Sequence, residues 1–146
     1  MALSPMTTTF TPQPNGGVYA INAYGLDYIE VNGVRHGSPL ILDPEHGPTP
    51  LAPGLTAATI GDDVMAMILS KAPEVVLIGT GNRQVFVSPA TLQPLSNRRI
   101  GVECMTLAAA CRTFNLLAAE GRKTIAVLLF DAQTQTDFVK TTNPQP

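Results

Sequence analysis

The chain has 146 residues, enough for one domain of ordinary size, since single hydrophobic cores typically occupy roughly 100 to 150 residues. Hydrophobic residues make up 45% of the chain and charged residues only 14%, which excludes a charge-rich disordered protein. The net charge of -2 argues against nucleic acid as a partner, because dedicated nucleic-acid binders need a clustered excess of Lys and Arg. The sparse surface charge also leaves homo-oligomer formation open.

Charge is distributed unevenly along the chain. Residues 1–78 carry two basic and seven acidic side chains, a net charge of -5, whereas residues 79–124 carry six basic and two acidic side chains, a net charge of +4. Two interpretations stand: complementary faces of one domain, or a local site for an anion or an acidic partner.

The sequence predicts a cytoplasmic protein without stable membrane insertion. The first basic residue is Arg35, so the start has neither the basic region of a secretory signal nor an Arg-rich mitochondrial presequence. The longest apolar run, Ile125–Phe130, suits a buried strand and is too short to cross a membrane.

The cysteines and histidines do not indicate a metal site. Cys104 and Cys111 are not in a C-x-x-C arrangement, and His36 and His46 have no ligand-like spacing with them. We therefore expect two reduced, buried thiols, with Cys111 on the apolar stripe of a helix, and neither a metal nor a cofactor.

The two ends of the chain differ from its middle. Residues 1–17 and 131–146 lack apolar periodicity and are predicted to be flexible tails, which leaves residues 18–130 as a single domain. The domain opens with three short β-rich runs, Val18–Ala23, Tyr28–Val31 and Leu40–Leu42. Asn32-Gly33 is a strong signal for a two-residue hairpin, and Thr49–Leu51 suits an edge strand. An antiparallel meander follows from this pattern.

The second half of the domain alternates helices and strands. Ile60, Val64, Met67 and Ile68 fall at helical spacing, and Pro73 ends that helix. Ser88-Pro89 begins a helix that Pro94 should distort or shorten, and Thr106 caps a helix that runs to Glu120. The strands are Glu74–Ile78, Ile100–Met105 and Thr124–Phe130. The fold class predicted is therefore α/β (mixed α+β): an N-terminal antiparallel meander followed by a βαβαβ unit with parallel strands, in a layered single domain.

Gly79-Thr80-Gly81, followed by Arg83, comes directly after a buried strand, at the carboxyl end where open α/β sheets bind ligands. The segment matches neither the dinucleotide-binding fingerprint nor a phosphate-binding P-loop, because Gln84 occupies the third glycine position and no Gly-Lys-Ser/Thr follows. The segment is compatible with three roles: a tight turn, an anion cradle completed by Arg83, or a loop that contacts another protein.

The helix capped by Thr106 carries Arg112, Thr113 and Asn115 near its middle. Arg112 and Asn115 share a face rich in alanine, opposite the apolar stripe, which favours contact with another chain or a neighbouring loop. Right-handed crossovers place the glycine loop and the start of this helix at the same edge of the sheet. We therefore predict one binding surface, composed of Gly79, Thr80, Gly81, Arg83, Arg112, Thr113 and Asn115. No catalytic residues are predicted.

A competing interpretation makes Arg112 and Asn115 internal braces. Their side chains would then satisfy loop carbonyls and pair with Glu103 or Glu120. Loss of both side chains would destabilise the fold in this case, whereas exposed contact residues could be removed at little cost in stability.

Three segments together resemble a known family: Glu74–Gln84 (EVVLIGTGNRQ), Gly101–Met105 (GVECM) and Ala108–Arg122 (AAACRTFNLLAAEGR). The family consists of small, largely uncharacterised bacterial and archaeal α/β domains, and it includes the mitochondrial complex I (NADH dehydrogenase) assembly factor 3 and an adipogenesis-associated cytosolic protein. The resemblance covers roughly residues 18–130. Where the family's strand usually ends in Glu-x-Met-Asp-Thr, this chain has Thr106 and Leu107 in place of Asp and Thr.

The resemblance implies a compact domain of sheet and helix layers, with no established enzyme activity among the bacterial members and an assembly role in the mitochondrial one. A shared fold does not transfer function by itself. We predict a non-enzymatic binding or assembly-factor-like bacterial protein, with a protein partner such as respiratory-chain subunits. The alternative is a small-molecule or anion-binding domain that uses the Gly79-Thr80-Gly81 loop, in which enzyme activity stays open.

Overall fold

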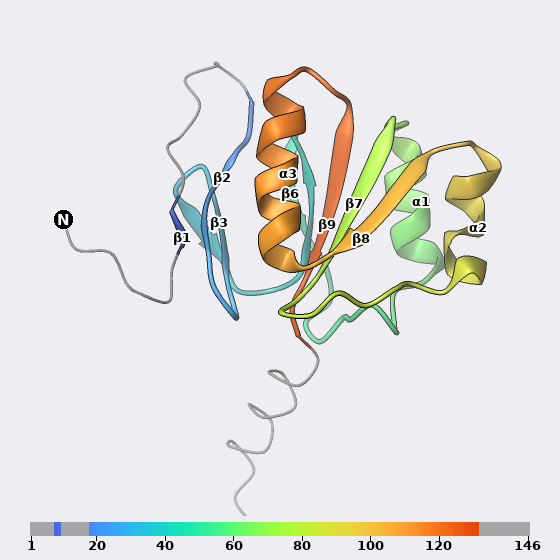
Figure 1. The fold of residues 1–146 in the computed structure, drawn as a ribbon, viewed down its shortest axis with the longest axis horizontal. Helices are drawn as coiled ribbons and strands as arrows, with labels where there is room; N and C mark the ends of the chain where they lie inside the picture. The colour runs from blue at the N-terminus through green and yellow to red at the C-terminus, as the bar shows by residue number, and fades with distance from the viewer. Residues whose placement is uncertain (1–7, 10–17, 132–146) are drawn as a thin grey trace, which may run out of the picture.

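The computed structural model describes residues 8–9 and 18–131 (Figure 1). The two predicted tails lie outside the described residues, except for Thr8, Thr9 and Asp131. Strand β1 (Thr8–Thr9) pairs antiparallel with β2 (Ile21–Tyr24), so deletion of residues 1–17 would remove a strand from a sheet.

The first sheet, sheet A, is antiparallel with the strand order β1-β2-β3-β4. Its strands β3 (Ile29–Val31) and β4 (Val34–His36) are joined by the predicted two-residue hairpin, with Val31 opposite Val34. Asn32 and Gly33 have φ angles of 48° and 85°, the left-handed conformation that this turn requires and that these two residue types adopt most readily.

The second sheet, sheet B, has the order β6-β5-β9-β7-β8. Its strands are β5 (Leu40–Asp43), β6 (Gly47–Pro50), β7 (Val75–Thr80), β8 (Gly101–Met105) and β9 (Thr124–Leu129). Strands β7, β8 and β9 are parallel, which confirms the predicted βαβαβ unit, and β5 pairs antiparallel with both β6 and β9. The strands of the first half are therefore antiparallel, as predicted, but divided between two sheets. Two prolines, which lack the N–H donor, confine β6 to an edge.

The described part of the chain contains three helices: α1 (Asp62–Ser70), α2 (Pro89–Asn97) and α3 (Leu107–Ala119). The predicted caps are present, since Ser88 Oγ accepts a hydrogen bond from Ala90 N and Thr106 Oγ1 accepts one from Ala109 N, both at 3.2 Å. Helix α2 continues through Pro94 to Asn97, so the proline does not end it.

The elements form layers around sheet B (Figure 1). Helices α1 and α2 pack on one face, and α3 packs on the other, where it lies between sheet B and sheet A. Phe114 of α3 is fully buried in the core shared by both sheets, together with Ile21 of β2 and Leu128 of β9. This arrangement brings one end of sheet A close to the edge of sheet B at which the parallel strands end.

Candidate functional site

A pocket of about 330 Å³ opens at the edge where the parallel strands of sheet B end. Gly81, Thr106 and Asp131, which follow β7, β8 and β9, all line it. Residues 24–26, at the end of β2 and in the turn that follows it, also line the pocket. The loop after β7 also touches the start of α3, since Leu107 N donates a hydrogen bond to Gly81 O at 2.8 Å. The glycine loop and the α3 start thus meet at one edge.

Gly79 at the end of β7 and Gly81 directly after it permit close packing. A methyl group at Gly79 would lie 2.8 Å from Cβ of Ala110 and 3.2 Å from Cα of Leu107. Gly81 has a φ angle of 88°, and a Cβ atom there would lie 2.6 Å from the backbone nitrogen of Asp131. Gly79, inside β7, needs glycine for the close approach of β7 to α3, whereas Gly81 needs it for its positive φ angle and for the contact with the end of β9. The tight turn predicted for the segment therefore begins at Gly81, and Gly79 and Thr80 belong to the strand.

Hydrogen bonds hold the rest of the loop in place. The buried Thr80 Oγ1 lies 2.6 Å from Arg83 O and accepts a hydrogen bond from Val85 N at 2.9 Å. Gln84 Nε2 donates to Cys104 O at 2.9 Å. Arg83 is exposed and lines a separate hollow of about 120 Å³, not the 330 Å³ pocket. The Thr80 hydroxyl therefore serves the loop itself, while the Arg83 side chain is available to a ligand or partner.

The three predicted residues of α3 have different surroundings. Arg112 is exposed, and its Nη1 lies 3.4 Å from the hydroxyl oxygen of Tyr24, a pocket residue. Thr113 is half-buried. Asn115 Oδ1 accepts a hydrogen bond from Ile21 N, and Asn115 Nδ2 donates to Ile21 O, both at 2.9 Å. Asn115 is thus an internal brace, to strand β2 and not to the loop carbonyls or glutamates that the competing interpretation named.

Sequence reasoning missed several residues at this edge. Tyr24, Leu26 and Asp131 line the pocket, and Leu26 is 50% exposed. The loop after β7 also presents Phe86, which is 77% exposed. The available signals were an apolar residue beside Gly25 between two β-rich runs, and an aspartate directly after the last predicted strand.

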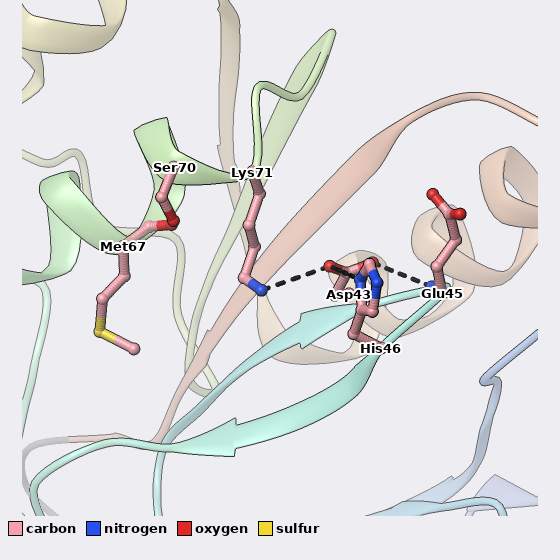
Figure 2. A network of polar contacts seen from close by, with 6 residues as sticks. All are labelled: Asp43, Glu45, His46, Met67, Ser70 and Lys71. Atoms are coloured by element: carbon pink, nitrogen blue, oxygen red, sulfur yellow. Dashed lines mark hydrogen bonds and ion pairs between the residues drawn. The ribbon is translucent and has the colours of Figure 1, made fainter.

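A polar cluster lies at the opposite edge, where the parallel strands begin. Asp43, at the end of β5, has a side chain only 8% exposed, and its Oδ2 lies 2.9 Å from His46 Nδ1 and 3.3 Å from Lys71 Nζ. Its Oδ1 accepts a hydrogen bond from Glu45 N at 2.9 Å. Figure 2 shows Lys71 and His46 directed at this carboxylate from α1 and from the β5–β6 turn. The cluster therefore ties that turn to the end of α1.

We expect the Asp43 cluster to stabilise the fold only while Asp43 is ionised. Burial raises the pKa of this carboxyl, but the hydrogen bonds from His46, the Glu45 amide and Lys71 outweigh it and lower the pKa below the ordinary 3.8. Because the pKa of Asp43 is lower in the folded state, its ionised carboxylate adds to the free energy of unfolding. This contribution is fully present above pH 3.8 and is lost as pH falls through the pKa of the folded state. Asp43→Asn should cost about 1 to 2 kcal/mol at pH ~7 and less at pH ~3, as measured by urea denaturation.

The exposed Glu45 provides the control, since Glu45→Gln should change stability by no more than about 0.5 kcal/mol. An Asp43→Asn variant whose deficit is as large in acid as at neutral pH would contradict this account.

Both cysteines are free thiols, as predicted. Cys111 is fully buried on the stripe of α3 that also contains Leu107 and Phe114, and burial raises the pKa of its thiol to about 12. Cys104 was also predicted to be buried, and this is wrong, since it lies on the edge strand β8 and is only half-buried.

We expect Cys111 to react with a maleimide only when the protein unfolds, because the thiolate is the reactive species and the thiol is covered. A Cys104→Ser variant leaves Cys111 as the sole thiol of the chain. Mass spectrometry should show slow labelling of this variant in buffer and fast labelling in denaturant. Equal rates under the two conditions would show that Cys111 is accessible.

Basic side chains gather at the edge where the parallel strands begin, beside the acidic Asp43, Glu45 and Glu74. Arg98-Arg99 come one residue before β8 and Arg122-Lys123 directly precede β9, so four of the six basic residues in 79–124 gather at the edge where these strands begin. Asp62 and Asp63 lie in the first turn of α1, at the opposite end. The two aspartates are favourable for the dipole of α1, because they lie at its N-terminus.

The fold and the pocket define a small layered α/β domain with a mixed sheet. Within residues 8–9 and 18–131, no three His, Cys, Asp or Glu side chains come together as ligands for a metal ion. In the same part of the chain, no helix has the length and apolar character needed to cross a membrane. The chain belongs to the protein family of unknown function DUF498/DUF598, whose pattern matches residues 21–129. The predicted resemblance to a small uncharacterised family is thereby confirmed.

One group of relatives carries a functional name. The mouse protein named NADH dehydrogenase (ubiquinone) 1 alpha subcomplex assembly factor 3 is 45% identical over 56 residues. That segment is 38% of this chain and only 30% of the mouse protein, so the chain spans less than a third of this relative's length.

Two solved structures share the fold over most of the chain. A protein from Bordetella parapertussis is 38% identical with a TM-score of 0.73, over 81% of this chain and 100% of the other. A protein from Bordetella pertussis, described as a Mth938-like domain, is 29% identical with a TM-score of 0.71, over 88% of this chain and 98% of the other. These similarities support the layered arrangement of two sheets and three helices.

Proposed function

We propose that this chain is a non-enzymatic assembly factor that binds protein subunits of a respiratory NADH dehydrogenase. The observation that carries the proposal is the 45% identity, over 56 residues, with a mouse protein named as an assembly factor of that enzyme. That the protein acts in the cytoplasm stays a prediction. Fractionation of the native cell tests it by showing which fraction contains the protein.

The surface proposed for this contact is formed by Leu26, which lines the 330 Å³ pocket, and by Arg112 and Leu116 of α3. Leu116 is 60% exposed, and it follows Arg112 by one helical turn on the outer side of α3. Leu26, at the pocket, is 50% exposed. Exposed leucine side chains beside an arginine suit a protein contact, where arginine is enriched among the residues that dominate binding energy.

The test is made in the cell that produces the protein. Deletion of the gene should lower the amount of assembled NADH dehydrogenase, measured on native gels and as NADH:quinone activity in membranes. The natural chain should restore it, whereas a chain with Arg112→Ala and Leu116→Ala should not. Because both side chains are exposed, each change should alter stability by no more than about 0.5 kcal/mol.

Arg98→Ala provides the matched control, since Arg98 is also exposed but precedes β8 at the opposite edge. This variant should restore assembly fully. If cells without the gene contain normal amounts of assembled enzyme, the respiratory role is refuted. If the variant with Arg112→Ala and Leu116→Ala restores assembly fully, these two residues do not form the contact surface.

The pocket favours a second candidate, the binding of a small molecule. Its volume of about 330 Å³ falls in the usual range for ligand pockets, about 300 to 1,000 Å³. Gly81, from the loop after β7, contributes to its lining, so an anion at this loop is the ligand to test. If the pocket binds an anion there, inorganic phosphate should raise the melting temperature. An unchanged melting temperature at high phosphate concentration would contradict this candidate.

A further inference from the structure

Strand β8 lies at an edge of sheet B, where it pairs only with β7 among the described strands. An open edge can pair with another chain, and proteins often protect such edges with prolines or by keeping the strand short. Strand β6, at the other edge of sheet B, carries two prolines, and the outer strands of sheet A, β1 and β4, have two and three residues. Strand β8 has five residues and no proline, so it is the least protected edge within residues 8–9 and 18–131.

The pairing with β7 determines which backbone groups of β8 point away from the sheet. Gly101 N donates a hydrogen bond to Glu74 O at 3.3 Å, directly before β7. Alternate residues of a strand direct both their N–H and their C=O to the same neighbouring strand, so Gly101 and Glu103 face β7. Val102 and Cys104 therefore direct their backbone groups to the open side.

Two groups of this outer row are already bonded within the chain. Gln84 Nε2, from the loop after β7, donates to Cys104 O at 2.9 Å. Just before the strand, Ile100 N donates to Leu95 O at 3.1 Å. No loop or side chain within residues 18–131 is bonded in this way to Val102 N, Val102 O or Cys104 N. The outer row is thus capped at two positions and open between them.

These two caps select one register for the antiparallel pairing of β8 with the β8 of a second copy. If Val102 lies opposite Val102, the two residues exchange both N–H···O=C bonds, and Cys104 N reaches Ile100 O of the other copy. Cys104 O then lies opposite Ile100 N, and both of these are already bonded, so neither cap has to break.

The neighbouring registers fit less well. A shift of two residues in one direction places Glu103 opposite Glu103, where like charges are destabilising, and directs Val102 N to the carbonyl that Gln84 already occupies. A shift of two residues in the other direction places Val102 O opposite Ile100 N, which is bonded to its own helix end and cannot donate. The register centred on Val102 is the one that leaves no open group unpaired.

Charge favours a second copy as the occupant of this edge. Glu103 on β8 and Arg99 just before it are both exposed, and neither has an ion pair within the described residues. In the register centred on Val102, each Glu103 lies opposite Gly101 of the other copy, two residues from its Arg99. Two attractions between Glu103 and Arg99 therefore outweigh one repulsion between the two Glu103 side chains at a similar separation.

We propose that two copies of this chain form a two-fold dimer by antiparallel pairing of their β8 strands, centred on Val102. Sheet B then continues from one copy into the other, and β8 is no longer an open edge. Because both copies use the same strand, the contact closes as a dimer and does not grow into a filament. The dimer does not depend on the proposed assembly function, since its surface includes neither Leu26, Arg112 nor Leu116.

Sedimentation equilibrium of the full chain over a concentration series measures this association. The natural chain should show a monomer–dimer equilibrium. Val102→Pro should raise the dimer Kd at least about 30-fold, because it removes both central N–H donors and puts a ring between the strands. Since Val102 N points away from β7, the sheet within each copy keeps its bonds. Val102→Ala is the matched control: it shortens the same side chain but keeps the N–H, and should change the Kd by less than about threefold.

A mixing experiment tests whether the occupant is a second copy in this orientation. Glu103→Arg and Arg99→Glu should each dimerise about tenfold more weakly than the natural chain, because each gives the paired strands charges of one sign. An equimolar mixture should form heterodimers, since the charges then alternate in sign along the paired strands. Addition of Val102→Pro to both variants should abolish this association, which separates strand pairing from a general attraction between oppositely charged proteins.

Four results would overturn the proposal. They are a natural chain that sediments as a monomer at every concentration, a Val102→Pro variant with an unchanged dimer Kd, a charge-reversed mixture that associates no better than its components, and a mixture that still associates when both variants carry Val102→Pro. Circular dichroism shows whether each variant is folded. If Val102→Pro fails to fold, the natural chain and the charge-reversed mixture still decide.

Discussion

Asn115→Ala is expected to lower the free energy of unfolding by about 2 to 5 kcal/mol, because two buried backbone groups would lose their hydrogen-bond partners. The carboxamide of Asn115 pairs with Ile21 N and Ile21 O in the way that a residue of a neighbouring strand would. Ile21 is fully buried, so water cannot replace either bond without opening the contact between α3 and β2. A loss of this size is a large fraction of the total stability of a typical domain, about 5 to 15 kcal/mol.

Urea denaturation followed by circular dichroism measures this loss. Asn97→Ala is the control, since Asn97 also lies on a helix and accepts a side-chain hydrogen bond, from Gln93, but is exposed. It should change stability by no more than about 0.5 kcal/mol. If Asn115→Ala were as stable as the control, Asn115 would belong to the exposed binding surface and not to the core contact.

Local signals in the sequence were sufficient to predict most elements of the fold. Asn32-Gly33 fixes a hairpin because few other residue pairs adopt two positive φ angles. Ser88 and Thr106 mark helix starts because their hydroxyls satisfy helix amides that would otherwise have no partner. Each of these features depends on neighbours within a few residues, which is why the printed sequence reveals it.

The pairing of distant strands was not predictable in this way. Leu40–Asp43 reads as an apolar strand, yet nothing within it indicates that it joins sheet B beside β9, with Leu40 opposite Leu128. The brace between Asn115 and Ile21 likewise joins residues 94 positions apart. Such contacts depend on how the layers stack, and an apolar run carries no information on its partner.

The candidate site was predictable in position but not in the roles of its residues. Parallel strands and right-handed crossovers place the Gly79 loop and the start of α3 at one edge, and the structure has both there. Arg112 and Asn115 are three residues apart on α3, yet Arg112 is exposed and Asn115 is bonded to β2. A spacing of three residues predicts a shared face, but it cannot reveal where another sheet covers that face.

Gly79→Ala should destabilise the fold by about 1 to 3 kcal/mol, the usual cost of adding a methyl group to a packed core. The added carbon would lie 2.8 Å from Cβ of Ala110 and 3.2 Å from Cα of Leu107, so β7 and α3 would have to separate. A glycine that served only to admit a ligand would tolerate the change at little cost in stability. Thermal and urea unfolding of Gly79→Ala distinguish these two roles.

A second substitution shows whether Ala110 is the cause. Ala110→Gly alone should cost about 2 kcal/mol, roughly half of it from the low helix propensity of glycine and half from the methyl group lost from the core. Combined with Gly79→Ala, it removes the closest contact, so the double variant should be more stable than the sum of the single changes by at least about 1 kcal/mol.

Gly37→Ala is the control, because Gly37 has open space around its Cβ position and should change stability by no more than about 0.5 kcal/mol. Additive effects of the two changes, or a Gly79→Ala variant as stable as Gly37→Ala, would show that close packing of β7 against α3 does not require glycine at this position.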